Sequence, residues 1–420
     1  MKHVLGLQCL ICGERYTPSE VEYVCPKHGD DGILDVVYDY GAIGRQVEKS
    51  GIAPFGSGGG IWRYKAMLPV RPDSPVPPLA VGDTPLYAAP RLAAELNLRE
   101  VWVKDDGRQP SASFKDRASA MAVVKAREKG AEIVATASTG NAAAALACLC
   151  ASVEQANVIF VPASAPPAKI AQLMVYGSTV LLVDGSYDDA FELCLEACRE
   201  FGWYNRNTAY NPYMSEGKKT VSYELCEQLG AEESAGWATP DVILVPVGDG
   251  CIIGGVHKGL KDLLALGWVE KMPRILGVQS AGSDYMWQAW SQNEDVLTKP
   301  PIAADTVADS ISAGLPRDRI KALAAVREAG GAYLRVSDAA ILAAIPILAR
   351  GAGVFAEPAA AASYAGLVQA VEEGLVTAGD RVVLLATGNG LKDIQSAMRS
   401  VGEPFRVAPR LEDVKRVLKK

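Results

Sequence analysis

The sequence predicts an α/β fold built on parallel sheets, and three observations predict it. From residue 101 onward, strand-like apolar runs alternate with helical segments, a rhythm that argues for parallel strands joined by helices. The chain of 420 residues exceeds one usual domain and suggests two or three units. Its 49% hydrophobic and 22% charged residues are ordinary for a soluble globular enzyme.

The expected elements follow one another in a regular order. After a first strand at 101–104, helix 116–129 is rich in alanine and is closed by Gly130. The further expected strands are 133–137, 157–161, 179–183, 241–247, 274–280 and 381–386, and the further expected helices are 141–151, 168–176 and 187–201.

Charge and hydropathy argue against several classes of protein. The formal net charge of −7 disfavours nucleic acid or an anionic membrane as a partner held by bulk charge. No apolar run approaches the ~20 residues that span a bilayer, and the opening residues lack a signal-peptide core, so we expect a cytoplasmic protein without a membrane partner. The nine cysteines are an odd count, and several lie in apolar helix-like stretches, which predicts free thiols.

Residues 1–40 are expected to form a module separate from the main domain at 41–420. Two short knuckles, Cys9 with Cys12 and Cys25 with His28, stand twelve residues apart. Four such ligands suit a tetrahedral structural zinc ribbon. A metal-free ribbon, folded by its own small core or by leaning on the main domain, fits the same residues. Both interpretations stay open.

The segment 111–117, Ser-Ala-Ser-Phe-Lys-Asp-Arg, organises the rest of the chain. Lys115 is expected at the junction of a loop with helix 116–129. A single lysine is usually a solvated surface group. Held in a partly dry cleft near other cations, its amine can lose a proton and attack a carbonyl carbon, as Schiff-base lysines do.

Three loops follow predicted strands, where open α/β sheets bind ligands. Ser138–Asn141 precedes a helix whose first N–H groups could cradle a carboxylate, and helix capping by Ser138 or Thr139 is compatible with that role. In the loop 248–252, glycines let backbone N–H groups converge on a phosphate, although a plain turn explains them too. The segment 387–393 indicates a turn and a helix start.

Together these segments resemble the threonine synthase branch of fold-type II pyridoxal-phosphate enzymes. The Ser-Phe-Lys-Asp-Arg core at 113–117 resembles its cofactor-lysine motif, and Ser-Thr-Gly-Asn at 138–141 resembles its carboxylate loop. Thr-Gly-Asn-Gly-Leu-Lys-Asp at 387–393 resembles its Thr-Gly-x-Gly-Leu-Lys-Asp signature. The resemblance implies a tryptophan synthase β-like fold with two open twisted parallel-sheet subdomains, the smaller at roughly 110–215, and a homodimer.

The resemblance also implies a role for each segment. Lys115 would hold pyridoxal 5'-phosphate and act as the catalytic base, while Thr387 would contact the pyridine nitrogen. Asn141 would bond the cofactor's ring hydroxyl, and the Asp249 side chain would turn away from the cofactor phosphate. The implied cofactor-binding residues are Lys115, Asn141, Gly248, Asp249, Gly250, Cys251, Ile252 and Thr387, and the substrate-binding residues are Ser138, Thr139, Gly140, Asn141 and Lys218.

One segment departs from the family pattern. At the positions equivalent to residues 211–220, threonine synthases have the sequence Asn-Pro-x-Arg-x-Glu-Gly-Gln-Lys-Thr. In that family the arginine and an upstream Asn-Ser pair bind the phosphate of O-phosphohomoserine. Met214 stands at the arginine position here, and Thr208 and Ala209 replace the upstream pair. A thioether cannot make the bidentate contact that a phosphate favours. Lys218, in place of glutamine, could restore a point charge.

Glu357 precedes Pro358 in a segment that also resembles the family. It could meet a substrate amine, but capping the helix that Pro358 opens is the expected role.

The leading hypothesis is a threonine synthase-like lyase that converts O-phosphohomoserine and water to threonine and phosphate. The altered phosphate grip keeps a second reaction open: α,β-elimination or β-replacement on another small amino acid, as in a threonine or serine dehydratase, a diaminopropionate ammonia-lyase or a cysteate synthase. A third hypothesis is a zinc-ribbon binding module joined to a catalytically silent domain. Residues 1–40 lack the basic footprint of a nucleic-acid binder, and Lys115 with its two glycine loops favours an enzyme.

Overall fold

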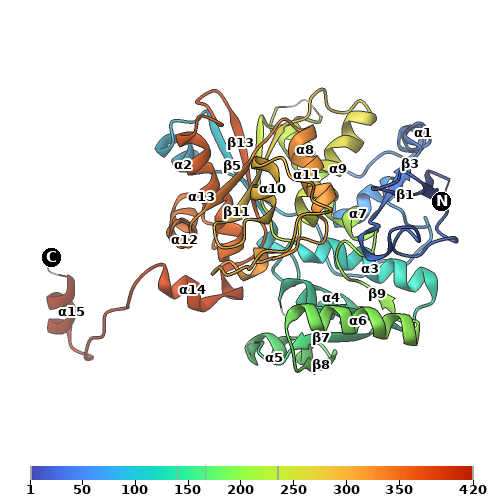
Figure 1. The fold of residues 1–420 in the computed structure, drawn as a ribbon. Coiled ribbons are helices and arrows are strands. Elements are labelled where there is room, and N and C mark those ends of the chain that lie inside the picture. Colours follow the sequence, from blue (N-terminus) through green and yellow to red (C-terminus); the bar gives the residue numbers. More distant parts are fainter. Residues whose placement is uncertain (1, 139, 166, 234–235, 419–420) are drawn as a thin grey trace.

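Two mostly parallel sheets and a small antiparallel sheet make up the fold (Figure 1). The computed structural model describes residues 2–138, 140–165, 167–233 and 236–418, so the predicted role of Thr139 lies outside the described residues. The large sheet has the order β12-β11-β10-β13-β5-β4, and only β4 runs antiparallel to its neighbour. Its strands are β4 (Leu86–Ala88), β5 (Glu100–Asp105), β10 (Val242–Pro246), β11 (Arg274–Ser280), β12 (Tyr333–Val336) and β13 (Arg381–Ala386).

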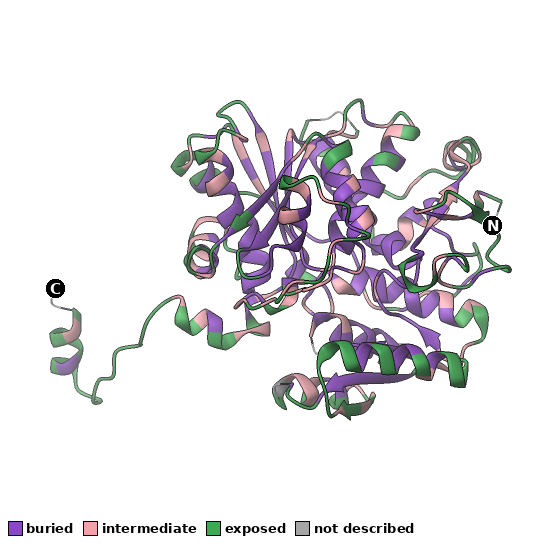
Figure 2. Ribbon diagram, viewed as in Figure 1, coloured by how far each residue is buried: buried purple, intermediate pink, exposed green. Residues whose placement is uncertain are grey.

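Helices cover both faces of the large sheet, because its strands carry apolar side chains on both sides. Val242 and Leu244 of β10 pack on one side and Ile243 and Val245 on the other. This two-sided burial is typical of parallel strands, and Figure 2 colours most residues of these strands as buried. One face packs against α2 (Pro90–Glu95), α12 (Asp338–Ala352) and α13 (Pro358–Glu372), and the other against α8 (Thr220–Glu232), α9 (Cys251–Ala265), α10 (Tyr285–Ser291) and α11 (Arg319–Glu328).

The small sheet has four parallel strands in the order β8-β7-β6-β9. On one face, α6 starts with a capping box in which Ser186 and Asp189 satisfy each other's backbone N–H groups. The strands are β6 (Ile133–Ala137), β7 (Ala156–Pro162), β8 (Thr179–Val183) and β9 (Tyr204–Asn205), and the accompanying helices are α3 (Lys115–Lys129), α4 (Asn141–Ala151), α5 (Pro167–Val175), α6 (Tyr187–Phe201) and α7 (Met214–Lys218).

The N-terminal module is an antiparallel sheet of β1 (Val4–Cys9), β2 (Arg15–Tyr16) and β3 (Leu34–Tyr38), followed by α1 (Tyr40–Ser50). Ion pairs fasten it to the main body: Asp35 contacts Lys258 of α9 at 2.6 Å and Lys321 of α11 at 3.2 Å. The module therefore lies against the main body near α3, α7 and α9 (Figure 1).

The C-terminal segment leaves the body. After α14 (Ile394–Arg399), an extended stretch leads to α15 (Leu411–Leu418), which lies apart from the rest of the fold in Figure 1. Among the described residues, no helix combines the length and the apolar character that crossing a membrane requires.

The structure confirms the predicted alternation of strands and helices. Strands 133–137, 179–183, 274–280 and 381–386 and helices 141–151 and 187–201 have the predicted bounds, and the other predicted elements differ by one or two residues at an end. The apolar runs did not predict β9 or β12. β9 has only two residues, too few to show a pattern.

Candidate active site

A cavity of about 440 Å³ lies at the carboxyl ends of strands from both sheets. The loop after β6 and the loop after β10 both border it, as ligand sites in open α/β sheets lead one to expect. It brings together most of the predicted site residues. Those that line it are Lys115, Ser138, Gly140, Asn141, Lys218, Gly248, Asp249, Gly250, Cys251 and Ile252.

Lys115 is the first residue of α3 and is half-buried at the cavity wall. The loop before Lys115 is held by the residue that follows β13, because the Phe114 N–H donates to the Thr387 carbonyl oxygen at 2.9 Å. Burial lowers the pKa of the Lys115 amine below its usual range, and the nearby Glu357 carboxylate acts in the opposite direction. A lysine with a lowered pKa can serve as a nucleophile or a base near neutral pH.

The glycine loop after β10 forms the start of α9. Gly250 is the N-cap residue with φ of 86°, and an added Cβ would lie 2.6 Å from the Ala322 side chain, so only glycine fits this turn. The first N–H groups of a helix lack partners within it and attract an anion. Asp249 Oδ1 accepts a hydrogen bond from the Arg317 N–H at 3.4 Å, which directs that carboxylate oxygen toward the Arg317 backbone.

Asn141 and Glu357 meet across the two sheets. Asn141 Nδ2 donates to the two Glu357 carboxylate oxygens at 2.8 and 3.1 Å, and to Ser310 Oγ at 3.2 Å. Glu357 stands at the N-cap position of α13 without a side-chain cap bond, so the predicted capping role of Glu357 is wrong. Its buried carboxylate turns instead toward Asn141 and Lys115, and burial raises its pKa.

Helix capping by Ser138 is not observed either. α4 has Gly140 as its N-cap residue and no side-chain cap bond, while Ser138 Oγ accepts from the Gly140 N–H at 3.2 Å. The start of α4 therefore keeps its N–H groups for another partner.

Two buried cations line the cavity, and each has a nitrogen without a hydrogen-bond partner among the described residues. Arg206 is 1% exposed and Lys218 is fully buried, and neither Arg206 Nη2 nor Lys218 Nζ has a hydrogen-bond partner among the described residues. Burial lowers the pKa of Lys218 to about 8 and that of Arg206 to about 10, and the Arg206 charge contributes to the Lys218 shift. Buried cations are normally paired, so this arrangement indicates a site for an anion.

Arg206 was missed by the sequence analysis. It follows the two-residue strand β9, and nothing in the surrounding Asn-Arg-Asn-Thr letters distinguishes it from a surface arginine. Two bonds fix its guanidinium: Nε donates to Ser119 Oγ at 3.2 Å and Nη1 donates to Thr208 Oγ1 at 3.1 Å.

The remaining predicted positions are not all at the cavity. Thr208 lines it, whereas Met214, Ala209 and Thr387 are buried but are absent from its lining. Met214 and Lys218 are the two ends of α7 and lie one turn apart on the same helix face. The cation is thus displaced by one turn from the position where the family pattern has arginine.

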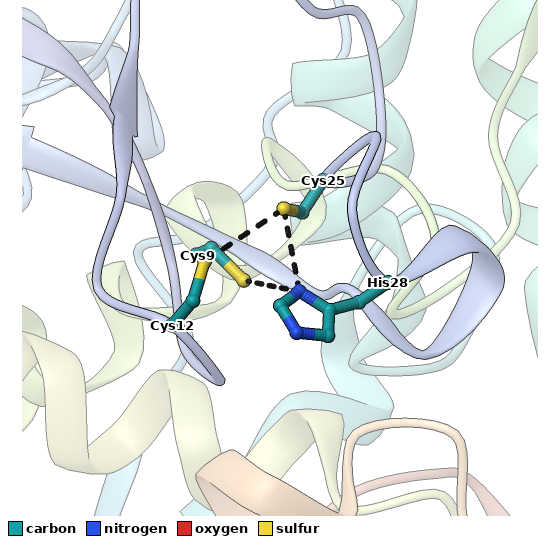
Figure 3. Close-up of side chains that lie close together, drawn as sticks. All are labelled: Cys9, Cys12, Cys25 and His28. Atoms are coloured by element: carbon teal, nitrogen blue, oxygen red, sulfur yellow. Dashed lines mark hydrogen bonds between the residues drawn. The ribbon is translucent and has the colours of Figure 1, made fainter.

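The knuckle residues of the N-terminal module converge (Figure 3). One ligand atom from each of Cys9, Cys12, Cys25 and His28 lies within 4.8 Å of the others. His28 Nδ1 is 3.7 Å from Cys9 Sγ and 3.5 Å from Cys25 Sγ, and Cys12 Sγ is 4.0 Å from Cys25 Sγ. Tetrahedral zinc bonds of about 2.1–2.3 Å separate ligand atoms by roughly 3.5–3.8 Å, so the four residues fit a zinc ion.

Comparison with known proteins identifies the family. The model of the family "pyridoxal-phosphate dependent enzyme" matches residues 78–388. A threonine synthase of Methanocaldococcus jannaschii is 36% identical over 414 residues, covering 98% of this chain and 99% of the relative. Threonine synthases of Methanosarcina acetivorans and Synechocystis are each 37% identical, over 98% and 84% of this chain and 98% and 89% of those relatives. The chain belongs to the threonine synthase family of pyridoxal-phosphate-dependent enzymes.

Solved structures agree with the fold of this family. Diaminopropionate ammonia-lyase from Escherichia coli superposes with a TM-score of 0.64 at 18% identity, covering 76% of this chain and 87% of that one. The processed form of threonine deaminase isoform 2 from Solanum lycopersicum gives a TM-score of 0.63 at 22% identity, with the same coverage. The fold-type II architecture expected from the sequence is confirmed.

The cavity suits the family's cofactor, pyridoxal phosphate. A lysine amine, an asparagine amide and a glycine-rich helix N-terminus border one space, and these are partners for an aldehyde, a ring hydroxyl and a phosphate. The chain is a pyridoxal-phosphate-dependent lyase, and the third hypothesis, a silent domain behind a ribbon, is set aside.

Proposed function

We propose that this enzyme converts O-phosphohomoserine and water to threonine and inorganic phosphate. Two buried cations on the wall of the cavity that holds Lys115 carry the proposal: Arg206 Nη2 and Lys218 Nζ both lack a hydrogen-bond partner among the described residues. A neutral substrate side chain would leave both charges buried and uncompensated, whereas a phosphate would pair with them. The full-length relatives that are threonine synthases support the same reaction.

The proposed roles follow from the positions of the side chains. When bound, pyridoxal phosphate supplies the electron sink that makes the substrate Cα–H acidic. Lys115 would hold the cofactor and then take the Cα proton with its freed amine. The start of α4, with Ser138 and Gly140, would bind the substrate carboxylate. Arg206 and Lys218 would bind the phosphate and stabilise the charge that develops on it as it leaves Cγ.

A product analysis tests the proposal. The holoenzyme is incubated with O-phospho-L-homoserine, and threonine and phosphate are measured together, with Lys115→Ala as the inactive control. We expect threonine and phosphate in equal amounts. Release of ammonia and a keto acid in place of threonine would contradict the proposal.

Met214 supports a second candidate, elimination or β-replacement on a smaller amino acid. Its thioether occupies the position where the family pattern has a phosphate-binding arginine, and it is buried outside the cavity lining. Serine, threonine, diaminopropionate and phosphoserine, tested beside O-phosphohomoserine, separate the two candidates. The second candidate gains if any of them is turned over with a higher kcat/KM.

We also propose that Cys9, Cys12, Cys25 and His28 bind one structural zinc ion. The convergence of four ligand atoms of the types that zinc prefers, all within 4.8 Å of one another, supports it. Protein purified without chelator is expected to contain about one zinc per chain by mass spectrometry, and Cys25→Ser is expected to lose it. Metal-free wild-type protein from zinc-supplemented cells would contradict this assignment.

A homodimer and a cytoplasmic location complete the proposal. Leu411 and Leu418 on α15 are 67% and 74% exposed, and an eight-residue helix is too short to be stable without a partner surface. A second copy of the chain would supply that surface. None of the nine cysteines forms a disulfide in the structure, as in most proteins of a reducing compartment.

A further inference from the structure

The N-terminal module covers the back of the loop that carries Arg206. Tyr23 lies in the segment between the two knuckles, and its phenol oxygen accepts a hydrogen bond from the Asn205 N–H at 2.9 Å. Its ring packs against Tyr204 and Tyr210, with ring centroids 5.9 and 5.3 Å away. One tyrosine of the ribbon therefore contacts both ends of the loop 205–210.

A second contact lies beside the first. Ile33, at 2% exposure, packs in a cluster with Ala209 and Cys251, and Leu10 of the first knuckle packs against the same cluster. Ala209 has φ of 66°, a conformation that costs a non-glycine residue energy unless its surroundings hold it. The ribbon supplies part of those surroundings.

Other bonds hold the loop from the side of β6: the Arg206 N–H donates to the Ala135 carbonyl oxygen at 2.8 Å, and the Asn207 side-chain oxygen accepts from the Ala137 N–H at 2.8 Å. Asn205 pairs with Ala135 in the short ladder between β9 and β6, and its side-chain oxygen accepts from the Asn207 N–H at 2.7 Å. Arg206 is the next residue, and its guanidinium bonds Thr208 within the same loop. A shift of the Asn205 backbone therefore moves the side chain that we propose to bind the substrate phosphate.

We propose that Tyr23 is a positioning residue, through which the N-terminal ribbon fixes the orientation of Arg206 and supports one wall of the substrate site from behind. The part of this inference that concerns substrate affinity rests on the proposed function of Arg206. The part that concerns the loop rests on the contacts of Tyr23 alone. The ribbon would thus act in substrate binding through Tyr23, in addition to any metal that its four knuckle residues bind.

The test compares two conservative variants of the holoenzyme. Tyr23→Phe keeps the ring and removes the oxygen that accepts from the buried Asn205 N–H. Tyr40→Phe is the matched control: Tyr40 donates to Asp262 near the far end of α9 at 2.6 Å, so it also loses one bond between the N-terminal part and the body. Both variants are examined by amide hydrogen exchange of the peptide covering 204–212 and by steady-state kinetics with O-phosphohomoserine.

We expect exchange in the 204–212 peptide to be roughly tenfold faster in Tyr23→Phe than in wild type, because a buried N–H loses its acceptor. KM is expected to rise by about the same factor while kcat stays within about twofold, since the loss is one of binding. Tyr40→Phe is expected to match wild type in both measurements. If Tyr23 had only a structural role, Tyr23→Phe would lower the stability of the fold and leave both KM and kcat at their wild-type values.

Two outcomes would overturn the inference. One is equal exchange of the 204–212 peptide in Tyr23→Phe, Tyr40→Phe and wild type. The other is faster exchange with an unchanged KM. If wild type itself does not consume O-phosphohomoserine, the proposed function fails, and the exchange measurement still decides whether Tyr23 positions the loop.

Discussion

At the scale of single residues, the site shows how a charge can be kept while its position changes. Met214 removes the expected arginine, yet Lys218 lies one turn further along the same helix and Arg206 enters from the neighbouring loop. Both cations are buried, and Arg206 Nη2 and Lys218 Nζ lack hydrogen-bond partners among the described residues. The loss of arginine at position 214 would by itself predict a less positive cavity wall. Arg206 and Lys218 keep the wall positively charged.

The pKa of Lys218 gives a prediction about pH. Burial lowers this pKa to about 8, so the amine is charged below about pH 8 and neutral above it. Affinity for a phosphate-bearing substrate should therefore fall as the pH rises through this value. We expect KM for O-phosphohomoserine to increase from pH 7 to pH 9.5 in wild type.

Lys218→Gln, which restores the family's residue, is the control for this effect. Its KM is expected to be higher at pH 7 and to change less between pH 7 and pH 9.5. If Lys218→Gln and wild type show the same pH dependence of KM, another group is responsible.

The sequence predicted the residues whose chemistry depends on local pattern. The neighbouring residues were enough to predict Lys115 at a loop-helix junction and the glycine loop 248–252 after a strand. Both line the cavity. Arg206 could not be predicted, since its burial and its bond to Ser119, which is 87 residues away in the chain, arise only when the chain folds. Glu357 was misassigned because its partner, Asn141, is distant in the chain.

At the scale of elements, α3 is anchored by a buried ionic network. Arg117, two residues after Lys115, donates to Asp106 at 2.7 Å and to Glu224 of α8 at 2.7 Å, and Lys104 of β5 donates to Glu224 at 2.9 Å. All four side chains are fully buried. The network ties β5, α3 and α8 together and fixes the direction in which Lys115 emerges.

Removing one member of this network should destabilise the protein strongly. Glu224→Gln leaves Lys104 and Arg117 with too little negative charge in a dry environment, so we expect a loss of about 3–5 kcal/mol in the free energy of unfolding. Denaturant titration measures it. Glu14→Gln, which breaks the exposed pair with Lys27, is the control and should leave the free energy of unfolding nearly unchanged.

The same network predicts a dependence of stability on acid. Burial opposes ionisation of Glu224, but Arg117 and Lys104 outweigh it and hold its pKa well below the usual range. A carboxylate with a lowered pKa stabilises the folded state above its unfolded pKa of about 4.3, and that contribution is lost as the pH falls below this value. A loss of 3–5 kcal/mol in Glu224→Gln that did not shrink toward low pH would contradict this account.

At the scale of the whole molecule, parts far apart in sequence converge on the cavity. The strand ends of both sheets supply its floor, and the N-terminal module lies behind its Arg206 wall. The alternation of strands and helices predicted the sheets, but the sequence did not predict that the module contacts the loop 205–210, which carries Arg206. That contact forms only after folding, when Tyr23 meets β9 and Ile33 packs against Ala209.

The C-terminal segment leads to a prediction about assembly. We expect the full chain to be a dimer in solution. A chain ending at Val401 is expected to be largely monomeric, because α15 and the extended segment before it would be missing. Light scattering after size-exclusion chromatography measures both. A truncated chain that stays dimeric would place the interface elsewhere.

The central claim is that Arg206 and Lys218 make this pyridoxal-phosphate enzyme selective for a phosphate-bearing substrate. The most direct test is the ratio of kcat/KM for O-phosphohomoserine to kcat/KM for threonine, in wild type and in Arg206→Met. We expect the ratio to exceed one in wild type and to fall roughly 10- to 100-fold in Arg206→Met, as loss of a charge-assisted contact predicts. A ratio that the substitution leaves unchanged would contradict the account.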